Sequence, residues 1–116
     1  EEETAAAIRR TWEESRYLCD PHTAVAIHAA QCYLKETGDS LPMVVDSTAS
    51  PYKFANNVYR AVTGQDPSSE LEALGQLSAA GTPIPYPLAG LAGRKIRFTD
   101  QCEPEEMARK VLEYIG

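Results

Sequence analysis

The sequence lacks long apolar runs, clusters of basic residues and a regular spacing of cysteines. No stretch approaches the roughly 18 consecutive apolar residues that a membrane-spanning helix requires. The net charge is −6 and the lysines and arginines are scattered, which excludes the basic surface of proteins that bind nucleic acids or anionic membranes. The three cysteines, Cys19, Cys32 and Cys102, form an odd set without the spacing of a disulfide framework. These absences predict a reduced protein in the cytoplasm.

Helix starts are marked by an acidic or hydroxyl residue directly before a proline, a pairing that occurs four times. The first side chain can accept a hydrogen bond from a free N–H group at the helix end, while the proline gives up only an N–H that had no partner. The 116 residues are enough for one domain and too few for two. The four pairs are Asp20-Pro21, Ser50-Pro51, Asp66-Pro67 and Glu103-Pro104. Together with the apolar spacing, they predict helices over residues 4–17, 21–36, 51–62, 67–77 and 104–115.

The helix expected over residues 21–36 differs from the others in its composition. Its segment 24–30 is small and apolar almost all round, which favours burial among neighbouring elements over a position on the surface. An apolar helix of this kind could also associate with a second copy of the chain. Gly38 supplies its expected end.

Two short strands are predicted between the helices. Residues 43–45 form an uninterrupted apolar run, typical of a parallel strand that is covered on both faces. Residues 95–98 alternate between polar and apolar side chains, as an edge strand does, and the Gly- and Pro-rich stretch 79–93 predicts a loop with short turns. Two strands make a marginal sheet. We therefore expect a mostly helical α/β fold whose strand at 43–45 packs against sequence outside this chain or against another copy.

A strand, a hydroxyl-rich turn and a helix follow one another around Ser47 and Thr48. In open α/β sheets, ligands bind outside the carboxyl ends of the strands, which is where these two residues are expected. A hydroxyl group there can donate one hydrogen bond to a heteroaromatic nitrogen. The same residues, with Ser50, could instead form no more than a turn that starts the next helix.

Two further residues are candidates for ligand contact, and each has a structural alternative. His22 lies in the first turn of a helix, where free N–H groups favour a phosphate, but residues 20–25 alone are also typical of a capped helix start. Lys53 could reach a phosphate or carboxylate, or be solvated. Cys19, His22, His28 and Cys32 do not match a zinc site, because the two histidines lie six residues apart on one helix and no standard ligand spacing is present. We predict no metal site.

Residues 20–25 (Asp-Pro-His-Thr-Ala-Val) and 47–54 (Ser-Thr-Ala-Ser-Pro-Tyr-Lys-Phe) together resemble the C-terminal signature of threonine synthase. The resemblance extends to the proline-rich residues 83–91 and to residues 103–115. In that family the enzyme converts O-phospho-L-homoserine and water to L-threonine and phosphate, on a type II fold that binds pyridoxal phosphate (PLP), in the cytoplasm. The resemblance therefore implies that this chain is the C-terminal part of such a fold.

By position, the resemblance implies that Thr48 hydrogen-bonds the pyridine nitrogen of PLP and that Ser47 lines the same wall. Ser50 stands where many family members have histidine, which weakens an imidazole role there. With His22 and Lys53 it is a candidate for contact with the substrate. A PLP enzyme also needs a lysine that holds the cofactor as a Schiff base, and no lysine here lies in a context resembling the family's motif: Lys35, Lys53, Lys95 and Lys110.

The leading hypothesis is that residues 1–116 form one C-terminal fragment, with its core motifs at 20–63, that needs the remainder of a threonine synthase chain. The complete enzyme would bind PLP and a small amino-acid phosphate, whereas this chain alone is not expected to catalyse the reaction. The alternative hypothesis is a catalytically inert helical module that self-associates through residues 21–36.

Overall fold

The computed structural model describes residues 1–80 and 83–116, and every regular element among them is helical. The expected mostly helical character is confirmed. The elements are α1 (Glu2–Ser15), α2 (Pro21–Thr37), the 3₁₀ helix η1 (Pro51–Phe54), α3 (Ala55–Thr63), α4 (Glu70–Ala79), the 3₁₀ helices η2 (Leu91–Gly93) and η3 (Pro104–Glu106), and α5 (Met107–Ile115).

Two of the predicted helix starts are capped as expected. The Asp20 side chain accepts hydrogen bonds from the first turn of α2, and the Ser50 side chain accepts one from Tyr52 N–H in η1. Gly38 ends α2 as expected, with a φ of 69° that glycine adopts without strain and with its N–H donating to Leu34 O at 3.0 Å.

The start predicted at Asp66-Pro67 is wrong, because α4 begins at Glu70. Ser69 is its N-cap, and its hydroxyl accepts a hydrogen bond from Glu72 N–H at 3.2 Å. The Glu72 carboxylate in turn accepts a hydrogen bond from Ser68 N–H at 2.9 Å. Asp66 instead forms an ion pair with Arg60 of α3. A reciprocal cap three residues further on therefore outcompetes the proline signal.

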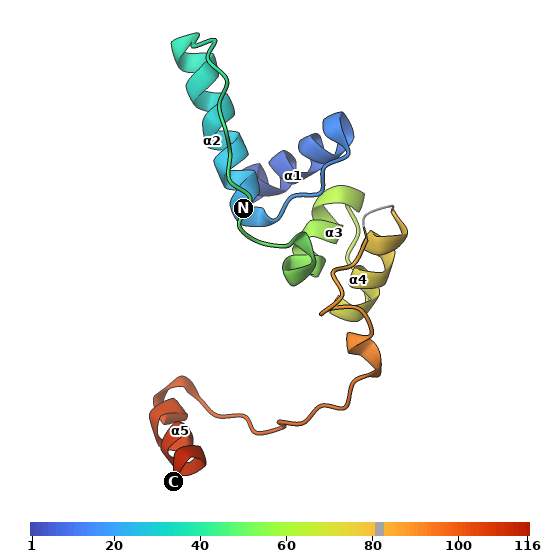
Figure 1. The fold of residues 1–116 in the computed structure, drawn as a ribbon, viewed down its shortest axis with the longest axis vertical. Helices are drawn as coiled ribbons and strands as arrows, with labels where there is room; N and C mark the ends of the chain where they lie inside the picture. The colour runs from blue at the N-terminus through green and yellow to red at the C-terminus, as the bar shows by residue number, and fades with distance from the viewer. Residues whose placement is uncertain (81–82) are drawn as a thin grey trace.

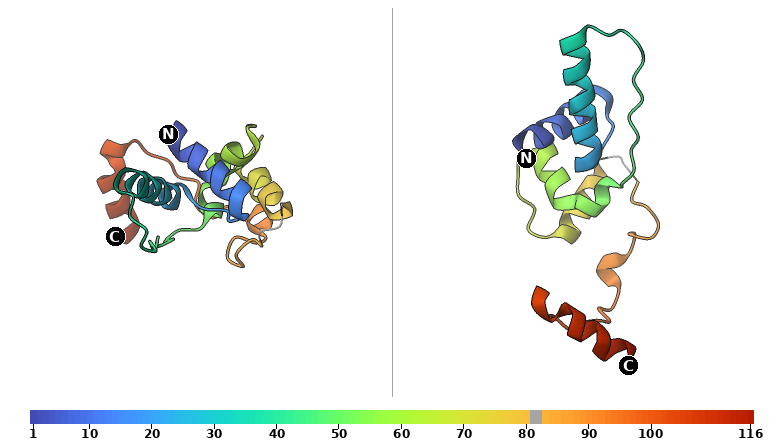
Figure 2. Two further views of the ribbon diagram at one scale, coloured as in Figure 1. Left: turned by 90° about the horizontal axis from the view of Figure 1, so that it is seen from above. Right: turned by 90° about the vertical axis from the view of Figure 1, so that its left-hand side faces the viewer.

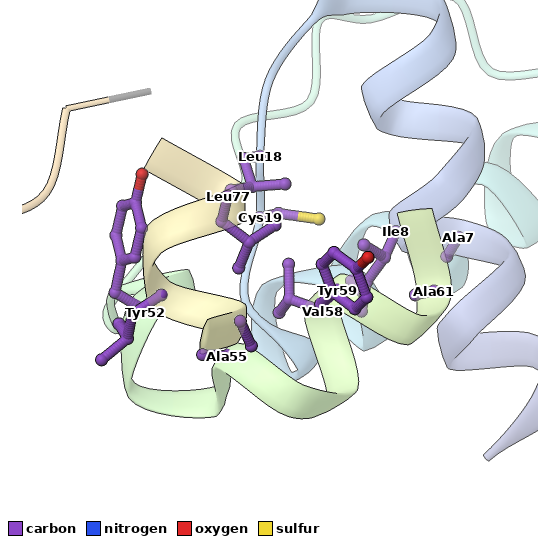
Figure 3. Close-up of a cluster of buried hydrophobic side chains, with 13 residues drawn as sticks. Ala7, Ile8, Leu18, Cys19, Tyr52, Ala55, Val58, Tyr59, Ala61 and Leu77 are labelled. Atoms are coloured by element: carbon purple, nitrogen blue, oxygen red, sulfur yellow. The ribbon is translucent and has the colours of Figure 1, made fainter. Parts of the chain in front are cut away.

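The hydrophobic core lies between α1, α3 and α4 (Figure 3). The connection after α1 contributes Leu18 and Cys19, and η1 contributes Tyr52, whose pKa is raised by burial. Arg9 of α1 also donates from Nε to Ala61 O of α3 at 2.8 Å. The buried apolar residues are Ala7, Ile8, Leu18, Cys19, Ala24, Tyr52, Ala55, Val58, Tyr59, Ala61, Ala73, Leu74 and Leu77.

Helix α2 projects away from this core, and residues 38–50 run back along its length (Figures 1 and 2). These residues are called the return segment below. The burial expected for residues 21–36 is largely wrong: of α2 only Thr23 and Ala24 are buried, whereas Val25 and Tyr33 are exposed. Its principal helix contact is with α1. An apolar sequence predicts a surface that needs covering, but it does not supply the neighbour that covers it.

Neither expected strand is formed in the described part of the chain. Residues 43–45 and 95–98 are irregular, and Val44, Ile96 and Phe98 are each more than 70% exposed. A strand is stabilised by hydrogen bonds to a neighbouring strand, and within residues 1–80 and 83–116 no strand lies beside these two segments. The described residues thus agree with the mostly helical part of the expected fold and do not confirm its strands.

The C-terminal part of the chain lies apart from the core. Residues 79–93 were expected to form a loop; here α4 ends at Ala79, residues 81 and 82 lie outside the described residues, and Ile84 and Leu88 pack partly buried against the core. An irregular segment then leads to η3 and α5, which lie far from α1–α4 (Figure 1). The Cα radius of gyration is 18.3 Å, whereas a compact domain of this length has about 13 Å.

Candidate functional site

The two sequence segments 20–25 and 47–54 lie together in space. Thr23 Oγ1 of α2 is 3.2 Å from Ser47 Oγ, although the two residues are 24 positions apart. The His22 ring packs edge-on against Phe54 of η1, with 5.1 Å between ring centroids and 61° between their planes. The start of α2 and the segment leading into η1 therefore form one local structure.

Asp20 organises the α2 side of this structure and is fully buried. Its Oδ1 accepts hydrogen bonds from His22 N–H at 2.9 Å and Thr23 N–H at 3.3 Å, and lies 3.2 Å from His22 Nδ1. Its Oδ2 accepts a short hydrogen bond from the Thr23 hydroxyl. Burial alone would raise the pKa of Asp20, but these hydrogen bonds to Thr23 and His22 outweigh it and hold the pKa below its usual value. The carboxylate is therefore the charged, acceptor-only centre of the site.

Ser47 is the contact point on the other side. Its Oγ accepts a hydrogen bond from the Tyr17 hydroxyl at 2.9 Å, in addition to its contact with Thr23. Tyr17 follows the end of α1, where Arg16 adopts a left-handed conformation with φ of 56°. Nothing in the sequence pattern singled out Tyr17, because its contact partner is 30 residues away.

The other predicted site residues have different surroundings. Thr48 is exposed, and within residues 1–80 and 83–116 its hydroxyl makes no hydrogen bond. Ser50 Oγ accepts the cap hydrogen bond from Tyr52 N–H at 3.3 Å. Lys53 is exposed on η1 and forms no ion pair with the described residues. The structure thus joins His22 to Ser47 through Asp20 and Thr23, with Thr48 next to Ser47 in the chain.

A hollow in the described surface lies beside this structure and not at Ser47 or Thr48. It has a volume of about 890 Å³ and lies between α1, the start of α2 and α3, with Arg9, Arg10 and Arg60 opposed by Glu2 and Glu13. His22 lines it, but Ser47 and Thr48 do not. A ligand held at Thr48 would therefore need its opposite wall from another polypeptide segment.

The histidines and cysteines do not gather into a larger cluster. His28 Nε2 is 3.7 Å from Cys32 Sγ on α2, and Cys19 is buried in the core, where burial raises the pKa of its thiol. In the described part of the chain, no three His, Cys, Asp or Glu side chains are placed to hold a metal ion. Nor is any helix there long and apolar enough to cross a membrane.

Comparison with known protein families gives a match over most of the chain. The family model described as "Threonine synthase, C-terminal" matches residues 23–114, which include the Thr23–Ser47 contact and the whole of η1. The chain belongs to the threonine synthase family and corresponds to its C-terminal part. The resemblance inferred from residues 20–25 and 47–54 is thereby confirmed.

Individual relatives agree with the family match. The chain is 35% identical to threonine synthase of Pseudomonas aeruginosa over 94% of its own length, and 38% identical to threonine synthase of Saccharomyces cerevisiae over 54%. It is 37% identical to threonine synthase-like 1 of Homo sapiens over 68%. These matches span 19%, 13% and 11% of the respective relatives. The chain therefore spans less than a fifth of the length of the relatives it matches.

Proposed function

We propose that this chain is the C-terminal part of a threonine synthase that converts O-phospho-L-homoserine and water to L-threonine and phosphate in the cytoplasm. The observation that carries the proposal is the family match over residues 23–114. The joining of the two signature segments through Thr23 and Ser47 supports it further. A self-associating inert module formed by residues 21–36 is not favoured, because the match extends far beyond that helix.

We propose that Thr48 forms part of the cofactor wall, with Ser47 beside it. The Thr48 hydroxyl is exposed and makes no hydrogen bond to the described residues, so it fits a single hydrogen bond to a heteroaromatic nitrogen. Bound PLP supplies the electron sink for the reaction. A hydroxyl partner, unlike a carboxylate, leaves the ring nitrogen neutral and tempers that sink.

The substrate phosphate is proposed to lie near Phe54. His22 packs against the Phe54 ring, and Lys53 directly precedes Phe54 in the chain and is exposed, so both remain candidates for contact with the phosphate. Hydrogen bonds from charged donors to phosphate are the stronger kind. Ser50 Oγ is occupied as the acceptor of a cap, but its own O–H remains able to donate.

The remaining parts of the site are proposed to come from the rest of the threonine synthase chain. Apolar residues outside the core remain exposed on the segments that flank it, notably Val44, Ile96, Phe98 and Ile115. Such surface is typical of a face that another segment covers. The Schiff-base lysine is assigned to that remainder, because no lysine of this chain lies in a matching context.

Replacing Thr48 by valine tests the cofactor role. We expect turnover to fall about fivefold and the cofactor absorbance to shift, since one hydrogen bond contributes about 1 kcal/mol net. The measurement is made on a complete enzyme in which this chain replaces the matching segment of the Pseudomonas aeruginosa threonine synthase. Thr99→Val is the matched control, because Thr99 is also an exposed threonine and lies in the irregular segment between η2 and η3. Unchanged turnover and an unchanged spectrum in Thr48→Val would contradict the role.

The isolated 116-residue chain tests the assignment of the lysine. When PLP is added to it, we expect no absorbance band of a lysine-bound cofactor and no release of phosphate from O-phospho-L-homoserine. The complete chimeric enzyme serves as the positive control for both signals. A specific, saturable band at one lysine of the isolated chain would overturn the proposal that the remainder supplies this residue.

A further inference from the structure

Four oxygen-bearing side chains from three segments form a continuous chain of hydrogen bonds. Tyr17 lies after α1, Asp20 and Thr23 lie at the start of α2, and Ser47 lies in the segment that returns along α2. The Tyr17 hydroxyl is 2.9 Å from Ser47 Oγ, Ser47 Oγ is 3.2 Å from Thr23 Oγ1, and Thr23 Oγ1 contacts Asp20 Oδ2. Tyr17 and Ser47 are exposed, whereas Thr23 and Asp20 are buried. This series of hydrogen bonds therefore leads from the surface to a buried carboxylate.

Which group donates in each of these hydrogen bonds follows from the number of protons that each side chain carries. Asp20 is an acceptor only, so the single hydroxyl proton of Thr23 is donated to it. Thr23 Oγ1 must then accept from Ser47, which in turn uses its own proton and accepts the hydrogen bond from Tyr17. Each hydroxyl then donates one hydrogen bond and accepts at most one, and each donated bond runs toward the charged Asp20 carboxylate. Hydrogen bonds that end on a charged group are stronger than neutral ones.

We propose that Asp20, Thr23 and Tyr17 are positioning residues that fix Ser47 and thereby orient Thr48 for its ligand. This inference rests on the proposed function for the role of Thr48, but the fixing of the segment stands on the geometry alone. Residues 43–46 are irregular, mostly exposed and without side-chain hydrogen bonds to the described residues. Ser47 is therefore the point at which the return segment is attached to α2 directly before Thr48. The Ser47 hydroxyl thus holds the backbone before Thr48 in place and does not itself contact the ligand.

Backbone order in the 116-residue chain tests the attachment. We expect the NMR order parameters of residues 46, 48 and 49 to fall from about 0.85 to below about 0.6 in Ser47→Ala. The same fall is expected in Thr23→Val, which keeps the shape but removes the hydroxyl, while Thr23→Ser should restore wild-type values. Ser40→Ala is the matched control in the same segment, because Ser40 makes no hydrogen bond to the described residues. Circular dichroism checks that helix content is unchanged, which Ser47→Ala should satisfy because Ser47 is exposed.

Turnover of the complete enzyme separates this inference from the proposed function. We expect Ser47→Ala to lower kcat several-fold, as a misplaced Thr48 would, and Tyr17→Phe to lower it less because the bond to Thr23 remains. Order parameters in Ser47→Ala that equal those of Ser40→Ala would overturn the positioning role. Mobility that rises in Ser47→Ala while Thr48→Val leaves turnover unchanged would instead refute the cofactor role of Thr48 and uphold the attachment. Loss of turnover in Thr48→Val without any loss in Ser47→Ala would refute the positioning of Thr48.

Discussion

Replacing Asp20 by alanine is expected to destabilise the chain by about 2–4 kcal/mol. The variant loses the N-cap of α2, which contributes about 1 kcal/mol, and leaves the buried Thr23 hydroxyl without its acceptor, which costs about 1–3 kcal/mol more. Both losses arise from one fully buried carboxylate. Urea unfolding at pH 7, followed by circular dichroism, measures the change. Asp46→Ala is the matched control, since Asp46 is exposed and forms no ion pair with the described residues.

The contribution of Asp20 also has a defined pH dependence. Hydrogen bonds hold its pKa in the folded chain below the value of about 3.9 that aspartate has when unfolded. The stabilisation is therefore complete above the unfolded pKa and is lost as the pH falls through the lower, folded value. Asp20→Asn, which cannot ionise but can still cap, should fall short of the wild type at pH 7 and approach it as the pH falls below the unfolded pKa and through the lower, folded one. A stability gap between the two that grows on acidification would contradict this assignment.

The sequence predicted those elements whose causes are local. Asp20 and Ser50 accept hydrogen bonds from N–H groups only two or three residues away, so their caps follow from residue type and position. The start of α4 was wrong because two local signals competed, and Ser69 with Glu72 outweighed Pro67. The strands at 43–45 and 95–98 could not be settled in this way. An apolar or alternating pattern indicates only that a residue suits a sheet, and the sheet itself requires neighbouring strands.

The candidate site divides along the same line. Residue types and order sufficed to mark His22, Ser47 and Thr48 as candidates, since they follow recognisable helix and turn signals. The hydrogen bonds that Ser47 makes to Tyr17 and Thr23 span 30 and 24 residues. Such contacts depend on how α1, α2 and the return segment are placed relative to one another. No local pattern around Tyr17 encodes that placement, and this is why the sequence missed it.

The same substitution, made once in α3 and once in α5, distinguishes the stability contribution of the core from that of the C-terminal helix. Val58 of α3 is fully buried, whereas Val111 of α5 is 55% exposed. Val58→Ala removes two methyl groups from the core and leaves a cavity, so we expect a loss of about 2–3 kcal/mol. Val111→Ala removes the same atoms from a helix whose principal contact is with its own leading turn, η3, and should change stability by less than about 0.5 kcal/mol. Thermal and urea unfolding of both variants, side by side, measure the difference.

The result for Val111 should depend on which polypeptide carries it. Helix α5 exposes Met107, Val111, Leu112 and Ile115, and its position away from α1–α4 leaves that apolar surface without a partner from the core. If the remainder of a threonine synthase covers α5, Val111→Ala becomes destabilising in the complete chimeric enzyme by about 1–2 kcal/mol, the transfer cost of the deleted methyl groups. Val58→Ala should cost the same in both contexts, because its neighbours belong to this chain. Equal, negligible effects of Val111→Ala in the isolated chain and in the enzyme would show that α5 does not dock, and would confine the interface with the remainder to the other exposed apolar segments, among them the ones that carry Val44, Ile96 and Phe98.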